Sequence, residues 1–211
     1  MDEAVKKAYA HLMARPRKFD EQQVLATARE RFWAGGYAGT SMDDIAAATG
    51  LGKGSLYGAF GGKQDLFHRV FDDYCNSVID ATAQQLGGDD DKNAYTRLSA
   101  HVHAVAAATA ADTAQRGCLL AKGTAELAEH DKTVADRAHT AIEALHALLK
   151  DDIAACQRNG DLDANADPGR LAALVLSVLR GIEALGKAGA DEEMLTDIAR
   201  TALAVLPRPA N

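Results

Sequence analysis

The chain has 211 residues and a net charge of −7, and 47% of its residues are hydrophobic, so it can bury a sizeable core in one large or two small domains. Alanine is abundant while aromatic residues make up only 5%, a balance that favours closely packed helices over a β-sandwich. No run is apolar enough to span a membrane and the N-terminus is charged, which argues against a membrane or secreted protein and predicts a cytoplasmic one.

Charge is divided unevenly along the chain. Residues 1–70 hold ten Lys and Arg against eight Asp and Glu, whereas residues 71–211 hold thirteen against twenty-two. The N-terminal third therefore carries +2 and the remainder −9. A mildly basic end joined to an acidic body suits a protein that touches DNA at one end only.

Residues 1–18 are interpreted as an N-terminal extension that ends in a basic arm, with Arg15, Arg17 and Lys18 just before the first expected helix. Such an arm can reach a DNA groove or the phosphate backbone, and the alternative is a disordered solubilising tail. The helix that follows has Asp20 as its N-cap. Its buried stripe is predicted to be Val24, Leu25, Ala28 and Phe32.

Residues 40–67 predict two short helices, a tight turn between them and the start of a third helix. Ser41 can cap the first helix with Asp44 as its reciprocal partner, and Gly50 supplies the left-handed residue that ends it. The second helix covers about 53–60, with apolar residues inward at i, i+4 spacing and small, polar and basic groups outward. That pattern is typical of a helix-turn-helix whose second helix enters a major groove.

A longer set of positions between residues 19 and 71 follows a known order and spacing. In chain order these are Val24-Leu25-Ala26-Thr27-Ala28 with Phe32, Gly35-Gly36-Tyr37, Thr40-Ser41, Asp44-Ile45-Ala46, Gly50-Leu51, Lys53-Gly54-Ser55-Leu56-Tyr57, Phe60, and Lys63 with Leu66-Phe67. This segment, about a quarter of the chain, resembles the DNA-binding domain of the TetR family of bacterial transcriptional repressors. The remaining residues match that family only in forming a helical region of suitable length.

The resemblance and the chemistry of the side chains together nominate a set of DNA-contacting residues. They are Arg15, Arg17, Thr40, Ser41, Lys53, Gly54, Ser55, Tyr57 and Lys63. Hydroxyl and ammonium groups suit phosphates, and Ser55 is the best candidate for a base edge. The alternatives are a solvated lysine at 63, a half-buried ring at 57 and simple capping at 40 and 41. Many members of the family carry bulky or polar side chains where this chain has Gly58 and Ala59, so the resemblance implies a smaller recognition surface here.

Beyond residue 63 the pattern is helical throughout, which makes the chain all-α with about nine helices. We expect a three-helix DNA-binding domain over 19–63 and a helical effector-binding and dimerisation domain over 64–211. The expected body helices cover 64–86, 94–111, 116–129, 132–158, 168–187 and 191–206. Within 116–129, Lys122 and Glu126 have i, i+4 spacing and are expected to pair.

The resemblance implies that the last two helices pair with those of a second copy and that the body encloses an effector pocket. Small residues at 181, 184 and 186 are expected to permit close approach of the two copies. Polar or reactive residues on otherwise apolar helices are the pocket candidates: His101, Cys118, Lys122, Glu126 and His146. Each can equally be a surface or satisfied core residue. The spacing of histidines and cysteines predicts no metal site, and no cofactor is expected.

We therefore predict a homodimeric repressor that binds a palindromic double-stranded DNA operator and is released by an unidentified small-molecule effector. An effector-independent activator or architectural DNA-binding protein is the alternative. An enzyme is disfavoured, because the GLGKGS run at 50–55 lacks the full spacing of a phosphate loop and follows no strand. Cys75, Cys118 and Cys156 are expected to be small core groups, with redox sensing by one of them as the alternative.

Overall fold

The computed structural model describes residues 19–88 and 93–209, and within those ranges the regular elements are nine helices. The predicted all-α fold is thereby confirmed. The helices are α2 (Glu21–Gly35), α3 (Met42–Thr49), α4 (Lys53–Phe60), α5 (Lys63–Leu86), α6 (Ala94–Ala111), α7 (Leu119–Leu127), α8 (Lys132–Asn159), α9 (Pro168–Lys187) and α10 (Glu192–Ala204).

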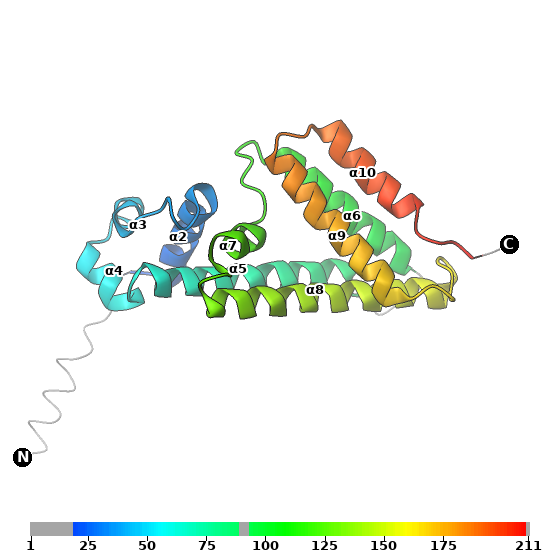
Figure 1. The fold of residues 1–211 in the computed structure, drawn as a ribbon, viewed down its shortest axis with the longest axis horizontal. Helices are drawn as coiled ribbons and strands as arrows, with labels where there is room; N and C mark the ends of the chain where they lie inside the picture. The colour runs from blue at the N-terminus through cyan, green and yellow to red at the C-terminus, as the bar shows by residue number, and fades with distance from the viewer. Residues whose placement is uncertain (1–18, 89–92, 210–211) are drawn as a thin grey trace, which may run out of the picture.

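The molecule is elongated, with the N-terminal helices at one end (Figure 1). Helices α2, α3 and α4 form that end, and the long helices α5 and α8 run side by side along the body. Helices α6, α9 and α10 pack together at the other end, and α7 lies between them and the N-terminal helices. Because α5 packs on α2 as well as on α6 and α8, it connects the two ends mechanically.

The N-terminal helices enclose a core of their own that continues into α5. The predicted stripe of α2 is buried, and the Asp20 side chain caps that helix by accepting the Gln22 amide at 2.9 Å. The ring of Phe67 on α5 lies edge-on to the rings of Phe32 and Tyr37, each at 5.1 Å between centroids. The first turns of α5 therefore belong structurally to the N-terminal core.

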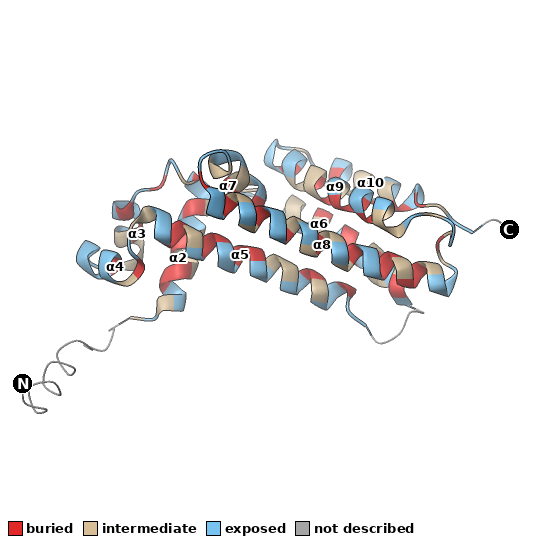
Figure 2. Ribbon diagram, turned by 60° about the horizontal axis from the view of Figure 1, so that its bottom comes forward, coloured by how far each residue is buried: buried red, intermediate tan, exposed pale blue. Residues whose placement is uncertain are grey.

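Buried residues recur along both long helices, while α4 is largely exposed (Figure 2). Along α8 the buried positions recur at helical spacing, from Val134 through Leu145 to Cys156. All three cysteines are free and buried, in agreement with their predicted place in the core.

Asp131 fixes the start of α8. Its carboxylate caps the helix by accepting the Val134 amide at 3.2 Å, and it also accepts a bond from Gln64 Nε2 at 2.8 Å. His68 Nε2 lies 2.7 Å from the same oxygen that binds Gln64. Although burial opposes the charge, these bonds lower the pKa of Asp131 to about 2. Asp131 thus ties the first turns of α5 to the N-terminus of α8.

The helix predicted over 116–129 was wrong at both ends, because α7 covers only Leu119–Leu127. Gln115 and Gly117 have φ values of 49° and 67°, which a right-handed helix cannot contain. The Arg116 amide and guanidinium bind the Asp112 carboxylate, so the chain turns there and the helix begins at residue 119. Inside α7, Gly123 is required by packing, since a Cβ there would lie 2.6 Å from Cε2 of Phe71.

Candidate nucleic-acid interface and ligand cavity

The turn between α3 and α4 has the predicted geometry. Ser41 Oγ accepts the Asp44 amide at 3.1 Å and the Asp44 carboxylate accepts the Ser41 amide at 2.8 Å, which completes a capping box. The bonds from Ser41 hold the pKa of Asp44 below its ordinary value. Gly50 ends α3 with φ of 69°, in the left-handed region that glycine enters without strain. The helix-turn-helix is therefore set by local interactions.

Helix α4 presents an outward face made of backbone and small groups. Leu56 and Phe60 are buried, and at 100° per residue the positions opposite them are Gly54 and Gly58. A Cβ at either glycine would meet no atom within 4 Å. A partner surface can therefore approach the backbone of α4 more closely here than at any helix that carries side chains on this face.

Two side chains flank the glycines, one on each side. Tyr57 is 52% exposed, which leaves its hydroxyl free to reach a partner, and Ser55 is exposed on the other side. Lys53, at the start of the helix, is exposed and pairs with Asp43 at 2.5 Å. Contact with a phosphate would require Lys53 to exchange that carboxylate for the phosphate.

Two of the predicted phosphate contacts have structural roles. Thr40 is buried, and its hydroxyl lies within hydrogen-bond distance of the carbonyls of Gly36, at 2.8 Å, and Arg31, at 3.1 Å, so that side chain secures the turn after α2. The Lys63 ammonium lies 4.2 Å from the centroid of the Tyr37 ring, in a cation–π contact. Arg15 and Arg17 lie outside the described residues.

The net positive charge of the N-terminal third of the chain comes from residues 1–18. Residues 1–18 hold five Lys and Arg against two Asp and Glu, whereas residues 19–70 hold five against six. Residues 19–70, which include the helix-turn-helix, are therefore slightly acidic by sequence.

Two side chains of α7 form hydrogen bonds with the C-terminal end of α2 and the turn after it. Lys122 Nζ donates to the Trp33 carbonyl at 2.9 Å and to the Ala34 carbonyl at 3.2 Å. Glu126 accepts the amides of Tyr37, at 2.7 Å, and of the next residue, at 3.2 Å. These two side chains were predicted to pair with each other and to line a pocket. The structure instead directs both to the end of α2 and the turn after it. Lys122 meets carbonyls that lack helical partners at the helix C-terminus, and Glu126 meets amides of the turn.

Trp33 makes a second connection between the two ends of the molecule. Its Nε1 donates to the Gly117 carbonyl at 2.7 Å, and the Arg116 guanidinium stacks 4.4 Å from its ring centroid. Arg116 also bonds Glu30 on α2 at 2.7 Å. The orientation of α2 is thus fixed by residues of the turn before α7.

Beside this connection lie two adjoining cavities of about 390 and about 320 Å³, between α2, α5, α6 and α9. They share lining residues from all four helices: Trp33, Tyr74, Val105, Ala108 and Glu183. The walls are mostly apolar or aromatic, which is the usual character of a small-molecule site. A molecule bound here would touch Trp33, the α2 side chain that donates a hydrogen bond to Gly117 in the turn before α7.

Helix α9 contributes an arginine and a glutamate to the lining of the larger cavity. Arg180 Nη1 lies 2.9 Å from Glu183 Oε2, and it donates to Cys118 Sγ at 3.3 Å. Tyr74 Oη also donates to Cys118 Sγ, at 3.7 Å. Burial raises the pKa of Glu183, and burial followed by the charge of Arg180 lowers the pKa of His101. At neutral pH, His101 is therefore uncharged.

The predicted pocket residues divide between several places. His101 lines the larger cavity, with its Nδ1 2.5 Å from Oε1 of Gln85. Cys118 does not line that cavity, but its Sγ accepts a bond from Arg180, which does. His146 is placed elsewhere, with Nε2 2.9 Å from the Gly169 carbonyl at the start of α9. Sequence reasoning missed Trp33, Tyr74, Arg180 and Glu183. Two opposite charges three residues apart on the apolar α9 were the available signal.

Models of one protein family match most of the chain. The model described as bacterial regulatory proteins of the tetR family matches residues 24–70, and the tetracyclin repressor-like C-terminal domain matches residues 94–202. The chain belongs to the TetR family. It is a DNA-binding transcriptional regulator and not an enzyme.

Known proteins are similar to this TetR-family chain over most or part of its length. The HTH-type transcriptional repressor ComR of Escherichia coli K12 is 26% identical over 92% of this chain and 91% of its own length. The HTH-type transcriptional repressor BdcR of the same organism is 34% identical, over 33% of this chain and 36% of its own length. The structure of a CifR cysteine mutant complexed with 26-bp double-strand operator DNA has a TM-score of 0.78 at 26% identity, and the match covers 92% of this chain and all of that one.

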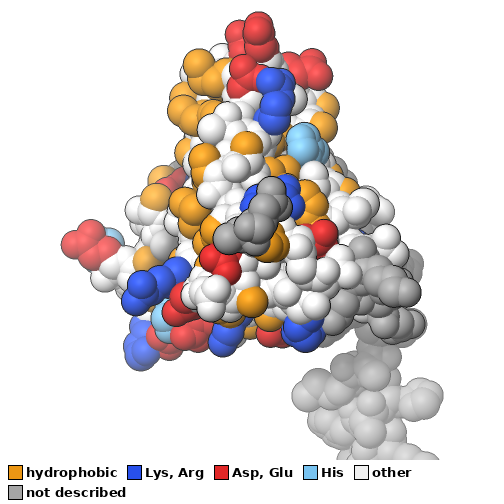
Figure 3. Space-filling view, turned by 90° about the vertical axis from the view of Figure 1, so that its right-hand side faces the viewer, with side chains coloured by type: hydrophobic (Ala, Val, Ile, Leu, Met, Phe, Trp, Pro, Cys, Tyr) orange, Lys and Arg blue, Asp and Glu red, His pale blue; other side chains and the backbone are white. Residues whose placement is uncertain are grey.

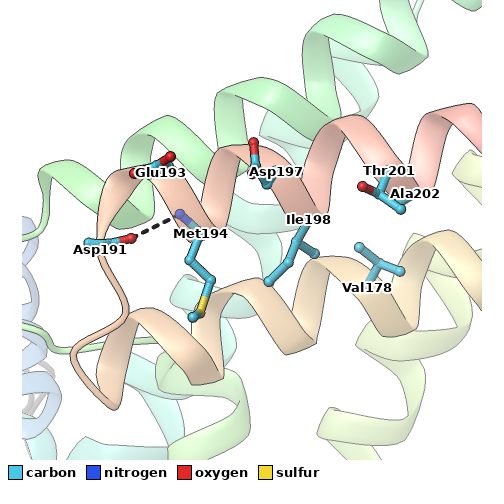
Figure 4. Close-up of a pocket in the computed structure, with 8 residues that line it drawn as sticks. All are labelled: Val178, Asp191, Glu193, Met194, Asp197, Ile198, Thr201 and Ala202. Atoms are coloured by element: carbon cyan, nitrogen blue, oxygen red, sulfur yellow. Dashed lines mark hydrogen bonds between the residues drawn. The ribbon is translucent and has the colours of Figure 1, made fainter.

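The far end of the regulator exposes an apolar surface. Four of the five large hydrophobic side chains that are exposed among the described residues lie on or just after α9 and α10: Leu174, Leu185, Met194 and Val205. Viewed from the end at which the chain terminates, hydrophobic side chains gather below a group of acidic ones (Figure 3). A groove of about 630 Å³ runs between the two helices, and Met194, Ile198 and Val178 point into it (Figure 4).

One of the small residues on α9 packs inside the monomer, and the predicted contact between copies stays a prediction for the other two. A Cβ at Gly186 would lie 2.2 Å from Thr109 of α6, so that glycine serves packing inside the monomer. Gly181 faces open space and Ala184 is exposed.

The described residues contain neither a membrane-spanning helix nor a cluster of metal-binding side chains. Every helix is too short or too polar to span a bilayer. Across 19–88 and 93–209, no three His, Cys, Asp or Glu side chains are grouped so that they could hold a metal ion.

Proposed function

We propose that this TetR-family regulator is a homodimeric repressor that binds a palindromic operator and is released by a small-molecule effector. The apolar surface of α9 and α10 carries the proposal. Exposed apolar groups at that spacing on two adjacent helices favour an interface between two copies, in which α9 and α10 form a four-helix contact. A two-fold dimer matches an operator with inverted half-sites.

At the DNA end, α4 enters the major groove through its glycine face. Close approach of the backbone at Gly54 and Gly58 lets Ser55 reach a base edge and Tyr57 a phosphate. Lys53 contributes charge, and Arg15 and Arg17 of the arm supply phosphate contacts. Ser41, the N-cap of α3, contacts a phosphate at the N-terminus of that helix. Lys63 supports the site while its ammonium group stays in the cation–π contact with the Tyr37 ring.

Release follows from the position of the cavity. An effector in the cavity touches Trp33 of α2 and the body helices at once, so it favours body conformations that reorient α2. Two recognition helices must lie about 34 Å apart to match one DNA turn, and a change in their separation lowers operator affinity. The effector can shift that equilibrium only by its differential affinity for the two conformations.

The dimer is tested by charged substitutions on the exposed apolar surface. We expect Leu174→Asp and Met194→Asp to shift the protein from dimer to monomer in sedimentation, because each places a carboxylate in the apolar contact. Operator binding should fall with it, since one half-site offers half of the contacts. Thr140→Asp, on an exposed position of α8, is the matched control and should stay dimeric.

If both variants remain dimeric with unchanged operator affinity, the interface lies elsewhere. If the unaltered protein is a monomer that binds its operator fully, the homodimer itself is excluded.

A further inference from the structure

We infer that the cavity between α2 and α9 binds a small organic carboxylate with an apolar body, whose head bridges Arg29 and Arg180. The inference rests on the proposed effector-controlled function and names the chemical class of the effector. Arg29 belongs to the DNA-binding domain and Arg180 to the body, and both line the larger cavity.

The two guanidinium groups have unused hydrogen-bonding capacity. Nε of Arg29 and Nε of Arg180 are buried without a hydrogen-bond partner within the described part of the chain. Arg29 forms long ion pairs with two carboxylates, Asp73 at 3.8 Å and Glu30 at 3.9 Å, and neither gives its Nε a hydrogen bond. A buried donor without a partner is costly, so a ligand that supplies acceptors to both groups gains that energy.

The charge of the cavity favours an anion. Its lining holds two arginines and one carboxyl group, Glu183. Oε2 of Glu183 is close to Arg180 Nη1 but lacks the alignment of a hydrogen bond. Burial raises the pKa of Glu183, so its charged form is less favoured in the cavity than that of an exposed glutamate.

The remaining walls select an apolar body for the ligand. Trp33 and Tyr74 lie edge-on with ring centroids 5.2 Å apart. From α5 and α6, alanine and valine side chains line the cavity together with a few uncharged polar ones: Ser77, Thr82, Gln85 and His101. A volume of about 390 Å³ is at the small end of ligand sites. This combination suits an arylalkyl carboxylate of modest size.

The two arginines explain how such a ligand would control DNA binding. A carboxylate held by both draws α2 and α9 into one fixed relation. Arg180 then contributes mainly to affinity, whereas Arg29 transmits the effect to the DNA-binding domain. This division is testable because binding and coupling are separate free energies.

The test uses the full chain and three probes of one shape: 3-phenylpropionate, 3-phenylpropionamide and 3-phenylpropylamine. Calorimetry should show the acid binding at least about tenfold more tightly than the amide, with the amine weakest. The Arg180→Gln/Glu183→Gln variant, which removes both charges together, should lose that preference. Arg170→Gln, an exposed arginine on the same helix, should keep it.

Operator binding gives the second measurement. The acid should weaken operator binding by the unaltered protein, and Arg29→Gln should still bind the acid while losing most of that effect. Equal binding of acid and amide, no binding of any probe, or a preference that survives in the double variant would overturn the inference. If the protein binds operator without responding to the acid, only this inference fails. If it binds no operator at all, the proposed function fails.

Discussion

Replacing Gly58 by alanine should stabilise the fold and weaken DNA binding. Gly58 lies in the last turns of α4, a Cβ there meets no atom within 4 Å, and its φ is not positive. Alanine is better than glycine in a helix by about 0.8–1 kcal/mol. Since nothing opposes the methyl group, the free energy of unfolding should rise by about 0.5–1 kcal/mol, which is about 1–4 °C in Tm for a chain of this size.

The same methyl group faces the DNA in the proposed complex. A methyl group forced into a close-packed contact costs about 1–3 kcal/mol, so operator affinity should fall by about 5- to 150-fold. Thermal denaturation and fluorescence anisotropy on one operator fragment, at fixed salt, measure the two effects. Thr140→Ala, exposed on α8, is the control and should stabilise the fold without changing affinity. An unchanged operator affinity in the stabilised Gly58→Ala protein would refute the account of α4.

Three further predictions concern the helix start at α8, the packing of α7 and the arm. Asp131→Asn should lower the free energy of unfolding by about 1–2 kcal/mol near pH 7; because the folded pKa is about 2 against an ordinary 3.8, this difference should shrink as pH falls from about 4 through about 2, and a difference as large at pH 2 as at pH 7 would contradict it. Gly123→Ala should destabilise the protein by about 1–3 kcal/mol in urea denaturation despite its better helix propensity, since the Cβ would lie 2.6 Å from Phe71; a more stable variant would show that α7 shifts freely. Arg15→Gln/Arg17→Gln should reduce the slope of log affinity against log salt by about 2, and an unchanged slope would exclude phosphate contacts by the arm.

The helix-turn-helix could be predicted because its determinants are local. A serine and an aspartate three residues apart make the capping box, and Gly50 alone supplies the left-handed turn. The i, i+4 spacing of Leu56 and Phe60 then sets which face of α4 is exposed. Each of these depends on residues within one or two helical turns, so sequence spacing is enough to place them.

The connection between the domains could not be predicted in the same way. Lys122 and Glu126 bind groups that lie 88 or 89 positions away along the chain, and their i, i+4 spacing suggested a pair with each other. Thr40 similarly has the type of a phosphate ligand but is buried by the turn after α2. Side-chain type gives the bonds a residue can make, whereas tertiary packing decides which partner it meets.

The cavity was only partly accessible to sequence reasoning. Its walls come from four helices, and the residue that joins them most directly, Trp33, belongs to the DNA-binding domain. His101 was identified because it is a polar group on an apolar helix. Arg180 and Glu183 satisfy the same criterion on α9, but a buried charge pair on a helix cannot be distinguished from a surface pair by spacing alone.

The central claim is that a dimer recognises a specific operator through α4. Selection of genomic fragments on the purified full chain at near-physiological salt, followed by sequencing, tests it most directly. The account predicts an inverted repeat with half-site centres about one helical turn, roughly 10 base pairs, apart, and poor recovery of the same fragments by Gly58→Ala. Retention of fragments without a common sequence, weak and lost at moderate salt, would contradict it.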